Sequence, residues 1–485
     1  MWLSRKVLVT IISLTAAAVL AILQPWLPRV VVGEVRINPR VHIDAEQQYR
    51  VVVWDYELPL PTGTTTHGEA IRNAAAAFTK AHPNITIDVV IKPWDDAVSL
   101  PDALAAGTPP DVAGLPDGAR LISAQLQVPL EHFFSKESAA DLYPAARAAA
   151  TAYGHMWAWP RYIDPAKWAV YMPMWQKSCQ TLSPQSCRSD GYIAPLTTTA
   201  WTAILTECRT KSGGCGIAAN VLDTRFYYEL TAGMTGTTLL NEDGDIAWKE
   251  DDVRNSAALI REWVTRGFLA ADIQSAARTR LGRFWSGRNL ALAPTTSLLW
   301  YHLWQHSGVL VSPDANPANQ NSGIGSTGRL EEAEHPVTWV TPPTGDHITT
   351  VAHVPGYAVF RQTKYQGDEQ TKAAAMVAEH LSRQVGSWEA TTLFGVPAHP
   401  SAVPEWQEES RLPTPVLQAL LDACVAYTVV TPPADDRLLL AEQRLLADSL
   451  LPGLLSVLQG NITAEEFAHD FVSLPAMAVS EAATP

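Results

Sequence analysis

The segment Leu104-Ala-Ala-Gly-Thr-Pro-Pro-Asp-Val112 decides how the rest of the chain is interpreted. Its Gly107 ends a short predicted helix, and the two prolines that follow exclude helix and favour extended backbone. An apolar run from Val112 then predicts a buried strand, and loop residues up to Gly118 end it. This order is typical of an open α/β sheet, in which ligands bind beyond the carboxyl ends of the strands. Asp117 therefore lies at a predicted binding edge.

Composition and charge limit the classes of partner. The chain has 485 residues, of which 47% are hydrophobic, so it is long enough to bury more than one core. The net charge of −14 argues against nucleic acid and against an anionic membrane surface as partners. The 17 tryptophans either pack the core or line a cleft with flat aromatic faces, and the sequence leaves both open.

Residues near the start of the chain predict the first strands and helix of such a sheet. Val51–Trp54 is an apolar run typical of a strand, and Glu69–Lys80 has helical spacing with one apolar face. A break at His82-Pro83 leads into a second predicted strand over Ile85–Ile91. Near the other end, Thr463 and Glu466 have the spacing of a helix capping box.

Short phrases follow one another along the chain in a characteristic order. They include Gly107 with Pro110-Asp-Val112, Ala77-Phe78 with His82-Pro83, Pro129-Leu130-Glu131, Gly154–Pro160, and Gly395-Val-Pro397. Together they resemble the sugar-binding family of bacterial extracellular solute-binding proteins, the substrate-binding subunits of ABC importers related to maltose-binding protein. The resemblance runs from about residue 50 to about residue 470, and Met172 departs from it where the family has Asn.

The resemblance implies an α/β, two-lobed periplasmic-binding-protein-like fold with an inter-lobe cleft. The first lobe is expected to hold residues 50–162 and 337–390, and the second residues 163–336 and 391–475, followed by a tail over 476–485. It also implies capture of a small-molecule solute, a carbohydrate or related polyol, outside the cell and its delivery to ABC permease subunits. No cofactor and no metal are expected.

The resemblance further implies which residues contact the ligand. They follow strands or lie on the crossover between lobes, and we expect them to face one space: Trp54, Tyr56, Glu57, Asp117, Tyr162, Asp164, Trp300 and Tyr357. Asp164 and Glu57 would accept hydrogen bonds from ligand hydroxyls. The alternative for Tyr162 and Asp164 is a polar hinge that touches no ligand, and the alternative for Trp54 is core packing.

An apolar N-terminal run predicts attachment to the membrane. Val7–Leu23 is uncharged, follows Arg5 and Lys6, and is long enough to span a bilayer. We expect residues 1–27 to be a signal anchor and residues 28–49 a stalk, which would hold the protein at the extracellular face of the cytoplasmic membrane. Cleavage after this run, which would give a secreted protein, stays open.

Four of the five cysteines fall within one short segment. Local disulfides Cys179–Cys187 and Cys208–Cys215 are expected, and long-range pairing such as Cys187 with Cys208 is the alternative. No Cys-x-x-Cys pair and no zinc-finger spacing of His is present in the sequence.

Two other functions remain as alternatives to solute import. A tethered sensor would bind the same ligand and report it to a membrane partner. A carbohydrate-active enzyme would need a pair of carboxylates, which a sequence rich in Asp and Glu does not exclude. The sequence lacks a P-loop, a Gly-x-Ser-x-Gly elbow and a His-Glu-x-x-His motif, so the protein is expected not to be an enzyme.

Overall fold

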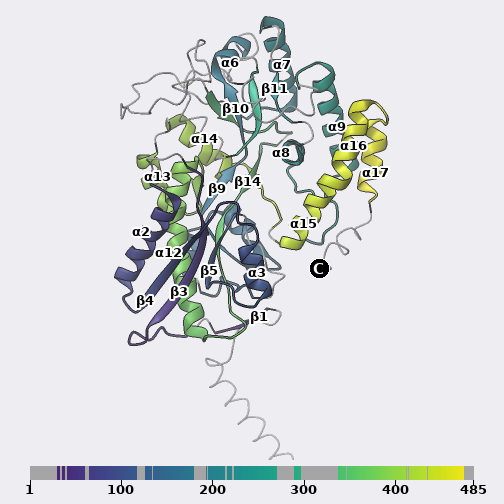
Figure 1. The fold of residues 1–485 in the computed structure, drawn as a ribbon. Coiled ribbons are helices and arrows are strands. Elements are labelled where there is room, and N and C mark those ends of the chain that lie inside the picture. The colour runs from purple at the N-terminus through teal and green to yellow at the C-terminus, as the bar shows by residue number, and fades with distance from the viewer. Residues whose placement is uncertain are drawn as a thin grey trace, which may run out of the picture.

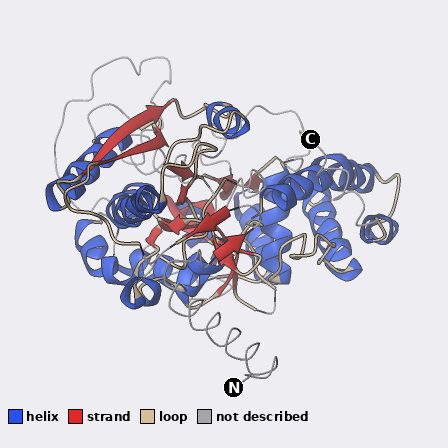
Figure 2. Cartoon of the chain, turned by 90° about the horizontal axis from the view of Figure 1, so that it is seen from below, coloured by secondary structure: helices blue, strands red, loops and turns tan. Residues whose placement is uncertain are grey.

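The structure, a computed structural model, divides into strands at the centre and helices on both sides of them (Figures 1 and 2). It describes residues 30–32, 35–38, 41–60, 65–116, 126–133, 135–179, 193, 195–212, 216–220, 223–269, 284, 289–296, 337–345, 347–410, 412, 414–433 and 435–474.

The first sheet begins with the elements predicted from the sequence. Its strand order is β4-β3-β5-β15-β8, with β3 parallel to β4 and β5, and β15 antiparallel to β5 and β8. The strands are β3 (Tyr49–Tyr56), β4 (Ile85–Lys92), β5 (Val112–Leu115), β15 (Gly356–Val359) and β8 (Trp159–Pro160). Helix α2 (His67–Ala81) starts at a capping box between Thr66 and Glu69, and α12 (Asp368–Leu393) packs against α2, β3 and β15.

A second sheet has the order β11-β12-β10-β13. Strand β10 (Lys167–Tyr171) pairs antiparallel with β12 (Ala291–Thr295) and β13 (Val337–Val340), and β11 (Ile217–Ala218) is parallel to β12. Helix α7 (Thr198–Ser212), α8 (Thr224–Thr235) and α9 (Glu250–Thr265) contribute apolar side chains to the core of this part.

The remaining helices surround these sheets. Their bounds are α3 (Ser99–Ala105), α4 (Lys136–Ala140), α5 (Pro144–Ala149), α6 (Met172–Cys179), α13 (Val403–Glu409), α14 (Thr414–Val425), α15 (Asp436–Arg444), α16 (Leu451–Gln459) and α17 (Ala464–Val472). A π-helical segment, Leu445–Leu450, joins α15 to α16. The predicted capping box of Thr463 and Glu466 is confirmed at the start of α17.

Strands of a third sheet connect the two parts. Its order is β16-β9-β14-β17, formed by β16 (Val396–Pro397), β9 (Tyr162–Pro165), β14 (Thr349–His353) and β17 (Thr428–Val430). Asp164 of β9 pairs with His353 of the antiparallel β14, and β14 is parallel to β17. The chain passes between the two halves of the molecule along these strands.

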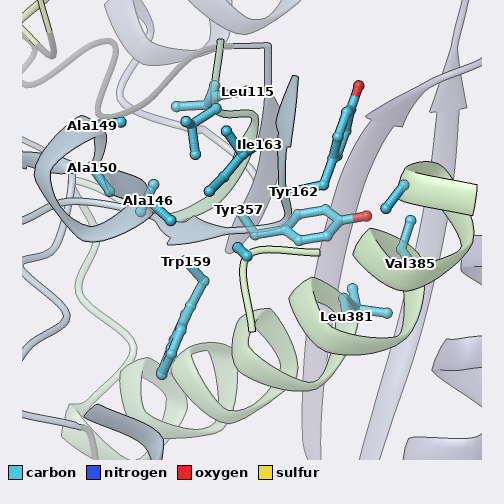
Figure 3. Close-up of a cluster of buried hydrophobic side chains, with 14 of the residues drawn as sticks. Leu115, Ala146, Ala149, Ala150, Trp159, Tyr162, Ile163, Tyr357, Leu381 and Val385 are labelled. Atoms are coloured by element: carbon cyan, nitrogen blue, oxygen red, sulfur yellow. The ribbon is translucent and has the colours of Figure 1, made fainter. Parts of the chain in front are cut away.

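Two hydrophobic cores share the strands of the third sheet, and the first core also takes in Ala169, Leu292 and Trp339 of the second sheet. Ile163 belongs to the first core and Ala166 to the second, and in β14 the neighbours Val351 and Ala352 are divided in the same way. Figure 3 shows part of the first core, where the ring of Tyr357 points toward α12. The first core also takes in side chains from α13 and α14, whereas α15, α16 and α17 pack in the second.

The predicted anchor over residues 1–27 and the tail over 476–485 lie outside the described residues. Within the predicted stalk, β1 (Val30–Val32) and β2 (Val35–Ile37) form an antiparallel pair. Among the helices that the structure describes, none combines the length and the apolar character that a bilayer span requires.

The cysteine pairing stays a prediction, because Cys187 and Cys215 lie outside the described residues. Cys208 is disulfide-bonded. Cys424 is a free thiol buried in the first core.

A buried carboxylate in α15 makes stability depend on pH. Glu442 is 3% exposed, its Oε2 accepts a hydrogen bond from the backbone N–H of Leu240 at 3.3 Å, and burial raises its pKa to about 8. A group whose pKa is higher in the folded than in the unfolded protein stabilises the fold while it is protonated. This contribution is complete at a pH below the pKa of the unfolded state, and it is lost as the pH rises through the pKa of the folded state. Wild-type stability should therefore fall between about pH 4.5 and about pH 8.

We predict that Glu442→Gln raises the melting temperature at about pH 8.5 and that the gain disappears near pH 4.5. The amide keeps an acceptor for Leu240 but carries no charge, and the expected gain is roughly 1–3 kcal/mol. Thermal unfolding followed by circular dichroism across this pH range measures it. The exposed Glu408→Gln serves as control and should change little. An unchanged or lowered melting temperature of Glu442→Gln at alkaline pH contradicts the prediction.

Candidate functional site

A buried arginine, Arg161, stands where the chain leaves the first sheet for β9. Its Nη1 donates to Oδ2 of Asp55 at 2.9 Å, and the hydroxyl of Tyr357 donates to the same oxygen at 2.6 Å. Its Nε lies 3.2 Å from Oε2 of Glu389, within ion-pair distance but outside hydrogen-bonding geometry. The side chains of Arg161, Asp55 and Glu389 are 7%, 2% and 2% exposed, so each charge depends on its partners rather than on water.

His67 of α2 also belongs to this buried group. Its Nδ1 donates to the backbone oxygen of Tyr56 at 2.6 Å, and its Nε2 lies 3.0 Å from Oε1 of Glu389. Burial lowers the pKa of His67, but the carboxylates of Asp55 and Glu389 outweigh this effect and the pKa is raised. The two carboxylates therefore favour the protonated form of His67.

Two glycines leave the space that these side chains need. A Cβ on Gly386 of α12 would lie 2.3 Å from the backbone oxygen of Arg161, and a Cβ on Gly114 of β5 would lie 2.4 Å from Oδ1 of Asp55. Any larger residue would push the helix or the strand away from the charged group. The close approach of α12 to the crossover therefore depends on Gly386, and the position of the Asp55 carboxylate depends on Gly114.

A second charged group lies further along the crossover. Asp164 of β9 forms an ion pair with Lys167, whose side chain is 1% exposed, while Asp164 itself is 16% exposed. Arg225, in the first turn of α8, donates through Nε to Oε1 of Glu229 at 2.6 Å and through Nη2 to the backbone oxygen of Thr295 at 3.2 Å. Burial lowers the pKa of Arg225, but Glu229 and, at longer range, Asp164 raise it overall.

This second group offers polar atoms to a bound molecule. Asp164 is partly exposed, and the side chain of Arg225 is 29% exposed, so each keeps contact with solvent while its neighbours fix its position. Glu229, at 1% exposure, is held by Arg225 and by Nε1 of Trp168 at 3.2 Å. A carboxylate acceptor and a guanidinium donor held in fixed positions suit a ligand rich in hydroxyl groups.

Two of the predicted ligand-contacting residues are core residues in this structure. Tyr357 is fully buried and its hydroxyl is used by Asp55. Tyr162 is 5% exposed and packs in the first core, close to Tyr357 (Figure 3). Trp54 packs against the same core, and the ammonium of Lys92 lies 4.1 Å from the centre of its ring. One face of the Trp54 ring is therefore already covered.

Tyr56 and Glu57 lie at the carboxyl end of β3 and are partly buried. Oε1 of Glu57 accepts a hydrogen bond from the backbone N–H of Gly68 at 3.2 Å. Burial, together with the charge of Asp96, raises the pKa of Tyr56. The predicted residues Asp117 and Trp300 lie outside the described residues.

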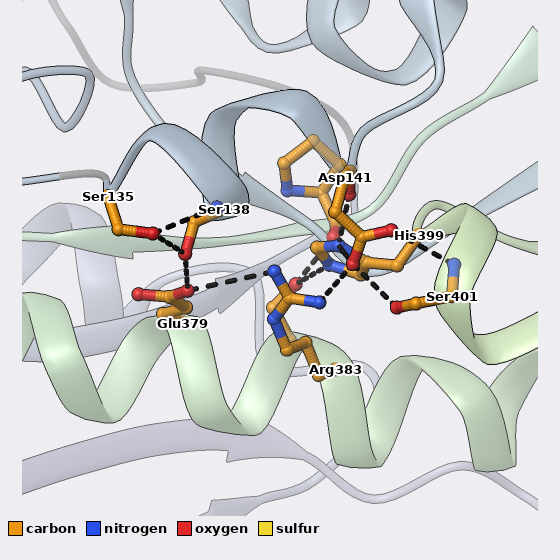
Figure 4. A network of polar contacts seen from close by, with 9 residues as sticks. Ser135, Ser138, Asp141, Glu379, Arg383, His399 and Ser401 are labelled. Atoms are coloured by element: carbon orange, nitrogen blue, oxygen red, sulfur yellow. Dashed lines mark hydrogen bonds and ion pairs between the residues drawn. The ribbon is translucent and has the colours of Figure 1, made fainter.

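A polar network joins α12 to the segments of Asp141 and His399 (Figure 4). It contains Ser, His and Asp side chains, so it is relevant to the alternative that the protein is an enzyme. Asp141 accepts hydrogen bonds from the backbone and hydroxyl of Ser401 at 2.9 and 2.6 Å and pairs with Arg383. His399 donates through Nδ1 to the backbone oxygen of Asp141 at 2.8 Å, and its Nε2 lies 3.1 Å from the hydroxyl of Ser382.

The Ser, His and Asp of this network do not have the access that a nucleophile requires. Ser382 is fully buried and also contacts the backbone oxygen of Pro160, and His399 is 1% exposed. Burial and the Arg383 cation lower the pKa of His399 to about 4. A neutral histidine that joins α12 to the crossover is a structural contact, because no substrate can reach the serine.

Two hollows lie away from the crossover. One, of about 1030 Å³, is open and lies between α2 and β4, from Arg72 to Val90. The other, of about 320 Å³, lies between α12 and the segment from His399 to Glu409. Neither contains a residue that the sequence predicts as a ligand contact, and two of the predicted contacts fall in loops outside the described residues.

Sequence reasoning missed the residues that hold the crossover together. No sequence motif marks these residues, which are Arg161, His67, Lys167, Arg225, Glu229 and Glu389. A signal for Arg161 existed, since an arginine between the apolar Trp159 and Ile163 needs buried anions. Its partners come from 106 and 228 residues away, and no spacing rule finds them.

We predict that Arg161→Met destabilises the protein by about 3–5 kcal/mol, because Asp55 and Glu389 lose their shared cation in a buried site. Urea unfolding followed by fluorescence measures the loss. Arg50→Met is the matched control: Arg50 and Asp88 form an ion pair with 74% and 41% exposed side chains, and the expected loss is about 0–1 kcal/mol. If the two variants are equally stable, Arg161 does not hold the crossover.

Comparisons with known proteins agree with this architecture. Residues 62–172 match the sequence model of a family described as bacterial extracellular solute-binding protein. No curated protein matches the chain in sequence.

Solved structures share the fold over most of the chain. The sugar-binding protein MalE from the phytopathogen Xanthomonas citri has a TM-score of 0.65 at 15% identity, covering 89% of this chain and 98% of its own. The GacH receptor of Streptomyces glaucescens, solved unliganded and with acarbose, has a TM-score of 0.59 at 16% identity, covering 90% and 100%. The ABC substrate-binding protein Lmo0181 from Listeria monocytogenes, solved with cycloalternan, has a TM-score of 0.59 at 14% identity, covering 88% and 97%.

These likenesses establish the two-lobed α/β periplasmic-binding-protein-like fold. The sequence match over residues 62–172 agrees with the resemblance to bacterial extracellular solute-binding proteins.

Proposed function

We propose that the protein captures a carbohydrate or a related polyol outside the cell and delivers it to the permease of an ABC importer. The observation that carries the proposal is the position of Asp164. Its carboxylate is partly exposed on the strand that joins the two cores, with the guanidinium of Arg225 near it. Solved relatives named for sugar, acarbose and cycloalternan binding support the class of ligand.

The proposed ligand site lies between the lobes at β9. Ile163 packs in the first core and Ala166 in the second, so Asp164 falls at the boundary where a hinge movement would open or close a cleft. From the sequence, the second segment of the first lobe is expected to end at residue 390. Because α13 and α14 add side chains to the first core, we propose to extend that segment to about Val425.

Within this site we assign different roles to the predicted residues. Asp164 and Glu57 would accept hydrogen bonds from ligand hydroxyls, Arg225 would donate them, and Tyr56 would do either. Asp117 and Trp300 remain proposed contacts. Tyr357 and Tyr162 would act through packing, since both are buried. Trp54 has one ring face under Lys92, which leaves stacking to other aromatic residues.

We propose that residues 1–27 tether the protein to the cytoplasmic membrane. The support is the uncharged run Val7–Leu23 after Arg5 and Lys6. The family description places its members outside the cytoplasm, so a tether would keep the binding lobes close to a permease.

A ligand screen tests the function directly. Mono- and oligosaccharides and polyols are added to the protein, and thermal unfolding is recorded for each. A ligand that binds only the native state at about 100 times its Kd stabilises it by about 2.7 kcal/mol. We expect at least one sugar to raise the melting temperature. A screen in which only non-sugar solutes, or none, raise it would overturn the proposed ligand class.

We predict that Asp164→Asn weakens binding of the sugar found in this screen by about tenfold or more. A charged acceptor contributes roughly 1.5–3 kcal/mol, and 1.4 kcal/mol corresponds to tenfold in Kd. Isothermal titration calorimetry measures the change.

Because Lys167 is buried beside Asp164, the single variant should also lose stability. The double variant Asp164→Asn, Lys167→Met removes both charges and serves as the control for this effect. It should regain stability without regaining affinity. If the double variant binds sugar as tightly as the wild type, Asp164 only neutralises Lys167 and the site lies elsewhere.

A further inference from the structure

We propose that Glu131, His132 and His155 form a binding site for a divalent cation of the zinc type on the surface of the first lobe. Nδ1 of His155 lies 2.6 Å from Oε1 of Glu131, and Nε2 of His132 lies 3.1 Å from the same oxygen. The three potential ligand atoms lie within 4.8 Å of one another, and in the described part of the chain no other group of His, Cys, Asp and Glu meets this condition. We call these residues the Glu131 cluster.

Backbone contacts fix the positions of these side chains. His155 belongs to β7 (His155–Met156), which pairs with β6 (Thr151–Ala152) across the tight turn of Tyr153 and Gly154. The backbone N–H of Leu130 donates to the oxygen of Met156 at 2.7 Å, and the N–H of Met156 donates to Oε2 of Glu131 at 3.0 Å. Each of the two segments, that of Glu131 and the strand of His155, thus donates a hydrogen bond to the other.

Further contacts hold β7 and the histidine ring. The indole N–H of Trp157 donates to the oxygen of Ala152 at 2.9 Å, and Nε2 of Gln127 donates to the oxygen of Trp157 at 2.7 Å. The ring of His155 meets that of Trp157 edge to face at 6.0 Å. A site held in this way needs little rearrangement to bind an ion, which reduces the entropic cost of binding.

The chemistry of the cluster suits a borderline cation. Two imidazole nitrogens and a carboxylate oxygen are common zinc ligands, with bonds of about 2.0–2.2 Å. A tetrahedron of such bonds puts its ligand atoms about 3.3 Å apart. The 3.1 Å separation is close to that value, and the 2.6 Å separation must widen by about 0.7 Å when a cation replaces the shared proton.

Partial exposure leaves room for the remaining ligand and for entry of the ion. Glu131, His132 and His155 are 28%, 36% and 31% exposed at their side chains. Water can therefore complete the coordination, as in zinc sites with three protein ligands. The hydrogen bond from Met156 to Oε2 orients the carboxylate so that Oε1 faces both imidazoles, and such outer contacts usually strengthen metal binding.

The β6–β7 hairpin also reaches the other half of the molecule. The hydroxyl of Tyr153, in the turn, donates to Oδ2 of Asp435 at 2.7 Å, and Asp435 caps α15, which packs in the second core. An ion that joins His155 to the 131–132 segment would therefore hold the base of a hairpin whose tip contacts the second lobe.

The test uses the full chain without a histidine tag, solubilised in detergent, and zinc ion alone. Equilibrium dialysis with elemental analysis measures the zinc bound per chain. We expect the double variant His132→Gln, His155→Gln to bind one zinc ion fewer per chain than the wild type. In the single variant His132→Gln, we expect the affinity of this site for zinc to fall at least about tenfold. His132 is the more exposed histidine, so its variant is expected to fold.

His469→Gln is the matched control. His469 is 71% exposed and lies 3.5 Å from Glu250, an imidazole–carboxylate pair without a second imidazole. It should bind zinc as the wild type does. If the wild type takes up no zinc, or if folded His132→Gln and the double variant bind it with wild-type stoichiometry and affinity, the proposal is overturned. The imidazoles then only hydrogen-bond to Glu131. Sugar binding is not part of this readout, so failure here leaves the proposed function untouched.

Discussion

The structure depends on one buried cation shared by two carboxylates. Arg161 joins Asp55, at the end of the first predicted strand, to Glu389, near the end of α12, at the point where the chain leaves the first sheet. Ions removed from water are costly unless they are paired, so the loss of any one of these three side chains would destabilise the fold. Once they meet, the direction in which β9 crosses to the second core is fixed.

The same arrangement separates residues that hold the crossover from residues that can meet a ligand. Arg161 and Tyr357 are buried, and both donate hydrogen bonds to Oδ2 of Asp55. Three positions further along β9, Asp164 is partly exposed and its charge is held by Lys167. A partly exposed polar side chain that is held by buried neighbours suits a preorganised binding site, because side chains fixed before binding lose little entropy on binding.

Local sequence patterns predicted much of the fold. The site was harder to predict, because its side chains pair with residues far away in the sequence. The strands over 51–54 and 85–91, the helix between them and the cap at Thr463 follow from periodicity and capping, which depend on neighbours in sequence. Tyr357 was expected to face ligand because it follows a strand-like phrase. Its hydroxyl instead meets a carboxylate 302 residues away, and no property of either segment reveals that contact.

The central claim is that a sugar binds between the lobes at β9. A crystal structure of the protein with the sugar that most raises its melting temperature tests this claim most directly. The account predicts density for the sugar within hydrogen-bonding distance of Asp164, about 2.7–3.2 Å, with both lobes in contact with it. Sugar bound away from β9, or on the outer surface of a single lobe, would contradict the account.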